Sequence, residues 1–256
     1  MVMENIKRTL ILITAITCLA VMPKEAAGQS AAEILERSEE MMRGNSQYAE
    51  MTMRIERPRY NREVSMRSWL MGRDFSLILI TAPARDNGTV FLMRENDIWN
   101  YDPRIDRTTR LPSSMMAQSW MGSDFTNDDL VRDSDIIDDF EHQILRTEEY
   151  NGFDAYVIEL IPKPDTPVVW GKVLIWICSE HYTQLRIENY DQRGQLANTM
   201  ELSEIEEFGQ RRVPTRIVVT PADRDNERTV LTYDKIEFDI DVDEAFFSRA
   251  NMQRVR

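Results

Sequence analysis

The sequence contains very little cysteine. Only Cys18 and Cys178 occur in 256 residues, and Cys18 falls in an N-terminal segment that we expect to be removed. One remaining cysteine cannot form an intrachain disulfide, so the folded chain must be stabilised by its hydrophobic core. Cys178 follows the apolar run 173–177, which predicts a buried and unreactive thiol.

Histidine is equally scarce, and the motifs of common enzyme sites are missing. His142 and His181 have no cysteine or histidine at metal-ligand spacing, which argues against a zinc site. The sequence has no glycine-rich phosphate loop, nucleophile elbow, dinucleotide fingerprint or paired nucleophile and base. Asp124, Asp128 and Asp129 do not match a calcium loop, and helix capping or a solvated face explains them better than acid catalysis. We therefore predict a protein that is not an enzyme and needs no metal or other cofactor.

Basic charge is also in short supply. The chain has 31 Lys and Arg against 44 Asp and Glu, a formal net charge of -13. Residues 1–28 carry three basic and two acidic side chains, a net +1, so the remainder carries -14. Such a surface repels nucleic acid and anionic headgroups. It either docks on a basic partner or only keeps the protein soluble, and charge alone does not decide between these alternatives.

The apolar run near the N-terminus is too short to cross a bilayer. It covers residues 9–21, whereas a membrane-spanning helix needs about 20 apolar residues. Lys7 and Arg8 precede it and Ala-Ala-Gly at 26–28 follows it, which is the pattern of a cleavable signal peptide rather than of an uncleaved anchor. We expect residues 1–28 to direct export to the periplasm, and residues 29–256 to form one domain.

Short alternating runs dominate the rest of the chain. Residues 51–56 and 64–71 alternate apolar and polar side chains, as half-buried strands do. Glu95-Asn96-Asp97 and Asn151-Gly152 separate pairs of such runs and predict hairpin turns. About ten or eleven strands joined by short turns imply antiparallel neighbours, and with few helices they favour a barrel or a strongly curved sheet.

Two helices are expected at the ends of the exported chain. Ser30 and Glu33 form the pattern of a capping box, which predicts a helix from Ala31 to Met42 with Gly44 as its stop. Its apolar side chains recur at helical spacing, so one face should pack on the sheet. Residues 243–247 predict a short terminal helix.

Residues 115–130, here called the Met-rich segment, interrupt the alternation. Three methionines, a tryptophan and a phenylalanine gather there, and acidic and amide residues follow them. Methionine adapts to irregular apolar shapes, which suits a lid over an apolar cavity. The alternative is a connector whose side chains plug the core.

Several strands are apolar on both faces. Trp69 and Met71 oppose Met66 and Leu70 in one predicted strand, and Trp176 opposes its apolar neighbours in another. A sheet of this kind is either covered on both faces or encloses an apolar ligand.

The segments at 98–103 (Ile-Trp-Asn-Tyr-Asp-Pro), Leu111-Pro112, 121–130 (Met-Gly-Ser-Asp-Phe-Thr-Asn-Asp-Asp-Leu) and 246–248 (Phe-Phe-Ser) together carry a family resemblance. With the signal peptide and first helix, the chain resembles the LolA-like outer-membrane lipoprotein-sorting proteins. The resemblance implies a mainly β fold with a few helices: a single curved antiparallel sheet that forms an unclosed β-barrel covered by helices and a lid. In the archetypal carrier of this family an arginine on the strands holds the lid shut, and no local motif assigns that role here.

The resemblance implies a monomeric periplasmic carrier that binds acyl chains of lipoproteins or other lipids in an apolar cavity. Its partners would be an inner-membrane transporter and an outer-membrane acceptor, without nucleic acid. The alternative is a sensor or adaptor that binds a membrane transporter or envelope-stress partner without lipid transfer. The large apolar side chains of the strands and the Met-rich segment are the predicted cavity lining and lid: Trp69, Met71, Phe91, Trp99, Met115, Met116, Trp120, Met121, Phe125 and Trp176.

Overall fold

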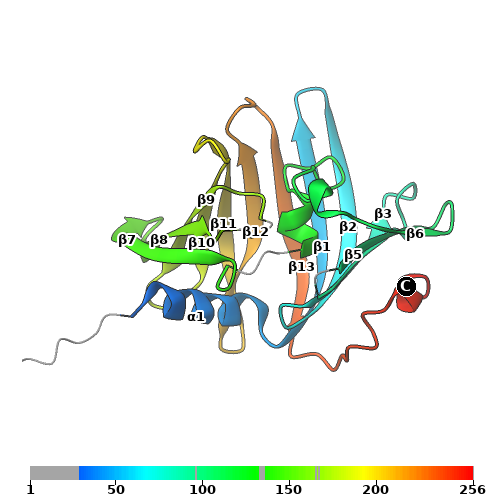
Figure 1. Ribbon diagram of the computed structural model, residues 1–256, viewed down its shortest axis with the longest axis horizontal. Helices are drawn as coiled ribbons and strands as arrows, with labels where there is room; N and C mark the ends of the chain where they lie inside the picture. The colour runs from blue at the N-terminus through cyan, green and yellow to red at the C-terminus, as the bar shows by residue number, and fades with distance from the viewer. Residues whose placement is uncertain (1–28, 96, 133–135, 165, 167, 256) are drawn as a thin grey trace, which may run out of the picture.

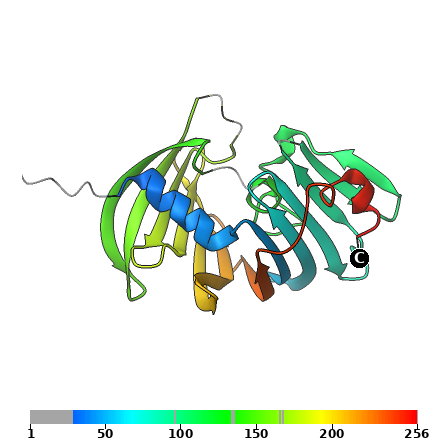
Figure 2. The ribbon, with the colours of Figure 1, turned by 90° about the horizontal axis from the view of Figure 1, so that it is seen from below.

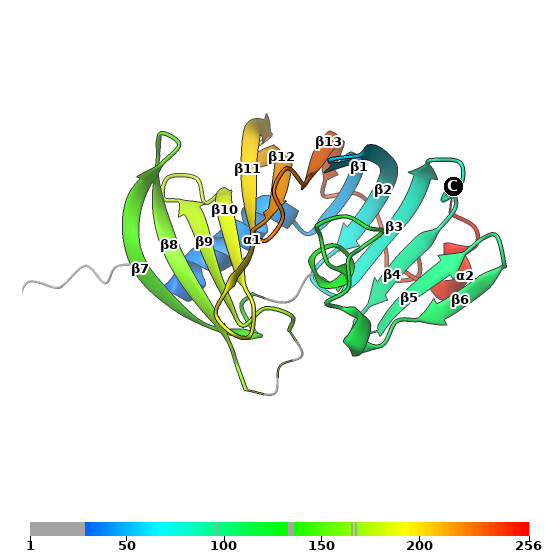
Figure 3. The ribbon, with the colours of Figure 1, turned by 90° about the horizontal axis from the view of Figure 1, so that it is seen from above.

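The computed structural model describes residues 29–95, 97–132, 136–164, 166 and 168–255. The expected signal peptide, residues 1–28, lies outside the described residues. Within them, thirteen strands form one antiparallel sheet in the order β6-β5-β4-β3-β2-β1-β13-β12-β11-β10-β9-β8-β7 (Figure 1). The sheet curves strongly, yet β6 and β7 stand at opposite ends of this order, so it is not closed (Figure 3). The predicted unclosed antiparallel sheet is confirmed.

The strand bounds follow the alternating runs of the sequence. The strands are β1 (Ser46–Arg57), β2 (Tyr60–Met71), β3 (Phe75–Ala82), β4 (Val90–Arg94), β5 (Asp97–Asp102), β6 (Arg107–Arg110), β7 (Phe140–Tyr150), β8 (Phe153–Pro162), β9 (Lys172–Cys178), β10 (Gln184–Tyr190), β11 (Leu196–Phe208), β12 (Arg211–Pro221) and β13 (Arg228–Phe238). Asn151 and Gly152 both adopt positive φ in the β7–β8 turn, as this hairpin dipeptide predicts.

The first helix, α1 (Ala31–Arg43), begins where predicted and ends one residue after the predicted Met42, at the predicted stop Gly44. The Glu33 amide donates to the Ser30 hydroxyl, the Ser30 amide donates to the Glu33 carboxylate, and Gly44 ends the helix with φ 65°. Ile34 and Leu35 are fully buried and pack with β8 and β9. No helix in the described part of the chain has the length and apolarity to cross a membrane.

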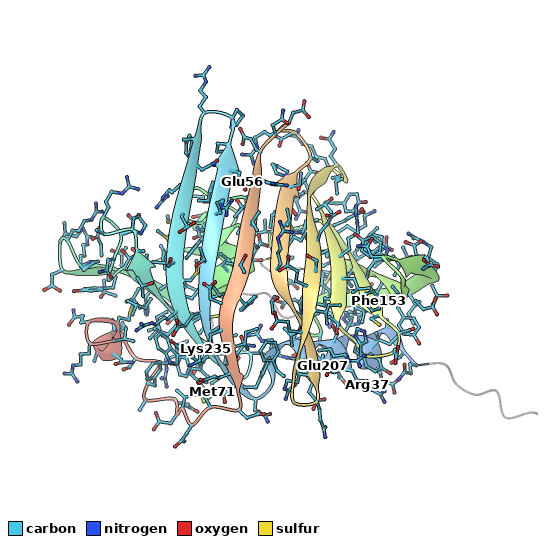
Figure 4. The ribbon with its side chains drawn as sticks, turned by 180° about the vertical axis from the view of Figure 1, so that it is seen from behind. Arg37, Glu56, Met71, Phe153, Glu207 and Lys235 are labelled. Carbon is cyan, nitrogen blue, oxygen red and sulfur yellow. The ribbon has the colours of Figure 1, made fainter. Side chains whose placement is uncertain are left out.

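The sheet has two covered faces because successive side chains point to opposite sides. On the face we call inner, α1 covers β7–β10 and the Met-rich segment covers β1–β5 (Figures 1 and 3). On the outer face, the central strands carry charged pairs such as Glu56–Arg228 and Lys235–Glu237, both at 2.6 Å (Figure 4).

The C-terminal residues 239–255 cross the outer face of β3–β5 (Figure 2). Phe247 and Met252 are fully buried there, and Arg94 donates to the carbonyl oxygens of Glu244 and Phe247. The helix predicted at 243–247 is wrong: those residues form a turn, and the only helix of this segment is α2 (Arg249–Met252). Burial of the adjacent phenylalanines in the outer cluster favours the turn over a regular amphipathic helix.

Candidate functional site

A cavity of about 230 Å³ lies on the inner face, between α1, the sheet and the C-terminal part of the Met-rich segment. We call it the inner cavity. Apolar side chains from successive strands form its wall: Leu160 from β8, Ile175 from β9, Ile187 from β10, Leu202 from β11 and Leu231 from β13. Phe125 and Leu130 of the Met-rich segment, together with Met42 of α1, complete the apolar lining. Ligand pockets usually measure about 300–1,000 Å³, so the inner cavity as it stands accommodates part of an acyl chain.

A buried ion pair fastens the Met-rich segment to the end of β1. Arg57 donates from its two terminal nitrogens to the two carboxylate oxygens of Asp124, at 2.9 and 3.0 Å. The side chains are 8% and 1% exposed. Thr229 of β13 adds a hydroxyl bond to the same carboxylate at 2.7 Å, and its oxygen accepts from the Asp124 amide. Charge-assisted bidentate pairs of this geometry are among the strong hydrogen bonds of proteins.

A second arginine holds the turn of the segment. Met121 and Gly122 both adopt positive φ, and Arg62 of β2 donates to the Met121 carbonyl at 2.6 Å. The other terminal nitrogen of Arg62 pairs with Asp86 at 2.7 Å. The segment is therefore held to the sheet by two arginines that sequence analysis did not single out, because both stand in ordinary alternating strands.

Asp129 caps the short π-helical turn Asp128–Arg132 that follows. The Thr126 amide donates to its carboxylate at 2.7 Å, and the Asp129 amide donates to the Thr126 hydroxyl. The predicted capping role is thus confirmed for this residue. Burial raises the pKa of the Asp129 carboxyl to about 6, although the bonds from Thr126 and from the Trp170 indole (3.2 Å) favour its charged form. Asp128 and Asp129 both line the inner cavity.

The raised pKa predicts a pH-dependent contribution to stability. Because the folded-state pKa of about 6 exceeds the ordinary aspartate pKa of 3.8, folding favours protonated Asp129, and this contribution to stability grows as the pH falls through 6. The free energy of unfolding of the wild type should rise relative to that of Asp129→Asn by about 1–2 kcal/mol between pH 7.5 and pH 5. Chemical denaturation of both proteins across this range measures the difference, and a constant difference would contradict the shift.

The structure divides the ten predicted site residues between the two faces. On the inner face, all in or against one cluster, lie Phe91, Met115, Met116, Trp120, Met121 and Phe125. Of these, Phe125 lines the inner cavity. On the outer face, Trp69, Met71 and Trp99 pack under the C-terminal segment, and Trp176 packs in a separate cluster and donates to Glu148 at 2.6 Å.

The four outer-face residues therefore do not border the inner cavity, and their predicted lining role is not carried into the site proposed below. Several residues that do border it were missed, among them Trp170, Ile187 and Tyr233. The available signal was the alternation of side chains along each strand, which places alternate residues on opposite faces of the sheet. Ile175 and Ile187 lie on the face opposite Trp176. The sequence did not show which of the two sets of alternate residues faces the cavity.

Both alternatives for the Met-rich segment describe part of the structure. Trp120 is fully buried against Phe91, with ring centroids 5.3 Å apart, and Met116 is 3% exposed. This half of the segment fills the inner face as a plug does. The following residues, from Phe125 to Leu130, instead border the inner cavity as a cover does.

One thiol and one imidazole meet on the outer face. Cys178 Sγ lies 3.2 Å from His181 Nε2, and His181 Nδ1 lies 2.7 Å from the Thr183 hydroxyl. Because that hydroxyl donates to the Arg212 carbonyl, Nδ1 carries the proton and Nε2 accepts from the thiol. Burial, together with the Arg212 charge, lowers the pKa of His181. The nucleophile–base contact that the sequence did not reveal thus exists, but Cys178 is only 1% exposed.

This burial predicts an unreactive thiol. Cys178 in the folded protein should react with iodoacetamide at least about tenfold more slowly than in the protein unfolded in guanidinium, because the thiol is reached only through opening of the sheet. Mass spectrometry of the labelled protein over time measures both rates. Equal rates would show an accessible thiol and reopen the case for chemistry at this pair.

Among the described residues, no group of three or more His, Cys, Asp or Glu side chains is arranged to hold a metal ion.

Comparisons with known proteins agree with this architecture. A family model described as "-like: Uncharacterized protein" matches residues 72–254. No curated protein matches the sequence at a significant level. A solved outer membrane lipoprotein-sorting protein domain from Vibrio parahaemolyticus is 25% identical, with a TM-score of 0.79 over 88% of this chain and 98% of that chain. A LolA superfamily protein from Nitrosomonas europaea is also 25% identical, with a TM-score of 0.76 over 87% of this chain and 99% of that chain.

A further solved structure shares the fold. A DUF1329 family protein from Desulfovibrio piger is 23% identical, with a TM-score of 0.78 over 87% of this chain and 98% of that chain. The fold is therefore common to chains that match over nearly their whole length. The chain belongs to the family of this model, and over nearly its whole length it resembles the solved lipoprotein-sorting and LolA superfamily proteins at 25% identity.

Proposed function

We propose that the protein is a periplasmic carrier that binds the acyl chains of lipoproteins or other lipids in the inner cavity and releases them toward the outer membrane. The observation that supports this most is an apolar cavity bounded by elements of two kinds. One wall is the rigid inner face of the sheet, and the other consists of α1 and the Met-rich segment. Each methylene that is removed from water contributes about 0.8 kcal/mol to the free energy of binding. Burial of a few methylenes therefore suffices to capture a lipid reversibly.

A whole acyl chain needs more room than the inner cavity offers. The Met-rich segment is the cover that can provide it, since its fully buried Trp120 and Met116 occupy the adjoining part of the same inner face. On this proposal the segment withdraws from the sheet as the chain enters. The Arg57–Asp124 pair then opposes opening by holding the segment to β1.

Lipid content and the binding of an apolar fluorescent probe test the proposal directly. The protein should be expressed with its own leader, purified without detergent and extracted with organic solvent. Mass spectrometry of the extract should show co-purified lipid, and the delipidated protein should bind the neutral fluorescent probe 1-N-phenylnaphthylamine at one site. A protein that carries no lipid and does not enhance the fluorescence of the probe would contradict the proposal.

The alternative is a sensor or adaptor that binds a membrane transporter or envelope-stress partner. Burial of Trp120 and Met116 supports this alternative, because the protein's own side chains fill the part of the inner face next to the cavity. Crosslinking in intact cells separates the two functions. A single membrane protein recovered without lipid would support the adaptor, whereas lipid together with a transporter or an acceptor would support the carrier.

A further inference from the structure

A second cavity of about 350 Å³ adjoins the inner cavity, and we call it the vestibule. The Met-rich segment, the β10–β11 turn and the β12–β13 turn line it. The β12–β13 turn stands at the end of the sheet opposite α1, so the vestibule and α1 lie at opposite ends of the inner cavity (Figure 1). Phe125 and Trp170 line both cavities and therefore form the partition between them.

One half of this partition is fixed to the sheet. A Cβ added at Gly171 would lie 2.5 Å from the carbonyl oxygen of Asp191, so the backbone beside Trp170 packs tightly against the β10–β11 turn. The Gly171 amide also donates to the Tyr190 carbonyl at 2.9 Å. Phe125, by contrast, belongs to the Met-rich segment, which covers the sheet. Withdrawal of this segment would therefore open a passage between the vestibule and the inner cavity beside a stationary Trp170.

The vestibule is more polar than the inner cavity. Hydroxyl and amide side chains contribute much of its lining: Ser119, Ser123, Thr126, Gln195 and Asn198. Its charged side chains are engaged within the protein, since Arg224 pairs with Asp124 at 3.3 Å and with Asp223 at 3.4 Å. Asp191 accepts two backbone amides of its own turn at 2.8 Å. An uncharged group that donates and accepts hydrogen bonds suits this lining better than an ion, which would have to compete with these contacts.

A buried amide pair continues this polar lining to the inner cavity. Asn189 lines the inner cavity, Asn198 lines the vestibule, and the Asn189 amide nitrogen donates to the Asn198 oxygen at 3.0 Å. Both residues are buried. The change from apolar to polar lining therefore falls at the partition. A molecule with an apolar tail and a polar head has the same division.

We propose that the vestibule binds the polar, uncharged head of the acyl ligand, such as the ester or amide at the end of the chain, while the tail passes between Phe125 and Trp170 into the inner cavity. This inference rests on the proposed carrier function and gives the ligand its direction in the site. Burial of the tail supplies the free energy of binding, and the head keeps its hydrogen bonds because it does not enter the apolar lining.

A fluorescent label at the vestibule tests this direction. Leu196 lines the vestibule and is 38% exposed, so Leu196→Cys can be labelled with monobromobimane. Two uncharged ligands carry a nitroxide quencher at opposite ends: 4-palmitamido-TEMPO at its amide head and methyl 16-doxylstearate near the end of its tail. Each is added to the delipidated protein at a concentration that displaces 1-N-phenylnaphthylamine fully. The head nitroxide should remove most of the bimane fluorescence, the tail nitroxide should leave most of it, and excess unlabelled N-methylpalmitamide should restore it.

Leu145→Cys is the matched control. Leu145 is 40% exposed on the edge strand β7, outside the linings of both cavities, and its label should keep its fluorescence with both ligands. Wild-type protein treated with the same reagent measures any labelling of Cys178. Equal quenching by the two ligands at position 196, stronger quenching by the tail nitroxide, or equal quenching at positions 196 and 145 would overturn the inference while leaving the carrier function intact. Failure of the probe and of both nitroxide ligands to bind would instead overturn the proposed function.

Discussion

Replacing Asp124 by alanine should lower the free energy of unfolding by about 3–5 kcal/mol, because removing one partner of a buried ion pair leaves the other charge desolvated. Asp124 is 1% exposed and accepts both terminal nitrogens of Arg57 as well as the Thr229 hydroxyl. Its loss releases the turn of the Met-rich segment from β1 and from β13. Denaturation in urea, followed by tryptophan fluorescence, measures the change.

Asp223→Ala is the matched control. Asp223 pairs with Arg224, which itself lies 3.3 Å from Asp124, but the Asp223 side chain is 83% exposed. Exposed pairs contribute about 0–1 kcal/mol, so this variant should stay within that range. If Asp124→Ala cost no more than Asp223→Ala, the buried pair would not be what holds the segment, and its role in opposing opening would have to be abandoned.

Replacing Ile187 by tryptophan should weaken binding of the neutral apolar probe 1-N-phenylnaphthylamine by about a hundredfold. Ile187 is half-buried on β10 and lines the inner cavity, so the larger ring occupies space that the ligand needs. Excluding about 110 Å² of the probe's apolar surface from the cavity, at about 25 cal/mol per Å², accounts for a loss of this size. Fluorescence titration with 1-N-phenylnaphthylamine measures the dissociation constant.

Ile205→Trp controls for the cost of the larger side chain itself. Ile205 is also a half-buried isoleucine of the sheet, but it packs with the outer-face cluster around Trp176. Its replacement should leave probe binding within about twofold of the wild type, since the two faces are separated by the sheet. If both variants bound the probe as the wild type does, the ligand site would lie elsewhere.

Much of the fold could be predicted because its signals are local. The capping box of Ser30 and Glu33 placed the start of α1, and Asn151-Gly152 placed the β7–β8 hairpin. Each depends on residues within a few positions of one another. The prediction of a short terminal helix was wrong because a distant contact outweighs the local pattern. Residues 243–247 have a local helical pattern, but burial of Phe246 and Phe247 on the outer face decides their conformation.

The candidate site was harder to predict because both faces of several strands are apolar. Trp69 and Phe91 are both large aromatic residues of predicted strands, yet Phe91 packs on the inner face and Trp69 on the outer face. Alternation shows that two residues lie on opposite sides of a strand. It does not show which side faces the cavity, because that depends on the direction in which the whole sheet curves and on which segments cover each face.

The sequence by itself determined the strand-rich, antiparallel character of the chain, its first helix and its family resemblance, since periodicity, turns and caps act over short distances. Only the tertiary structure decided where the cavity lies and how its cover is held. Arg57 and Asp124 are 67 positions apart, and Trp170 and Asp129 are 41 apart. Their hydrogen bonds, and the raised pKa that burial gives Asp129, exist only when the curved sheet brings distant segments together and excludes water between them.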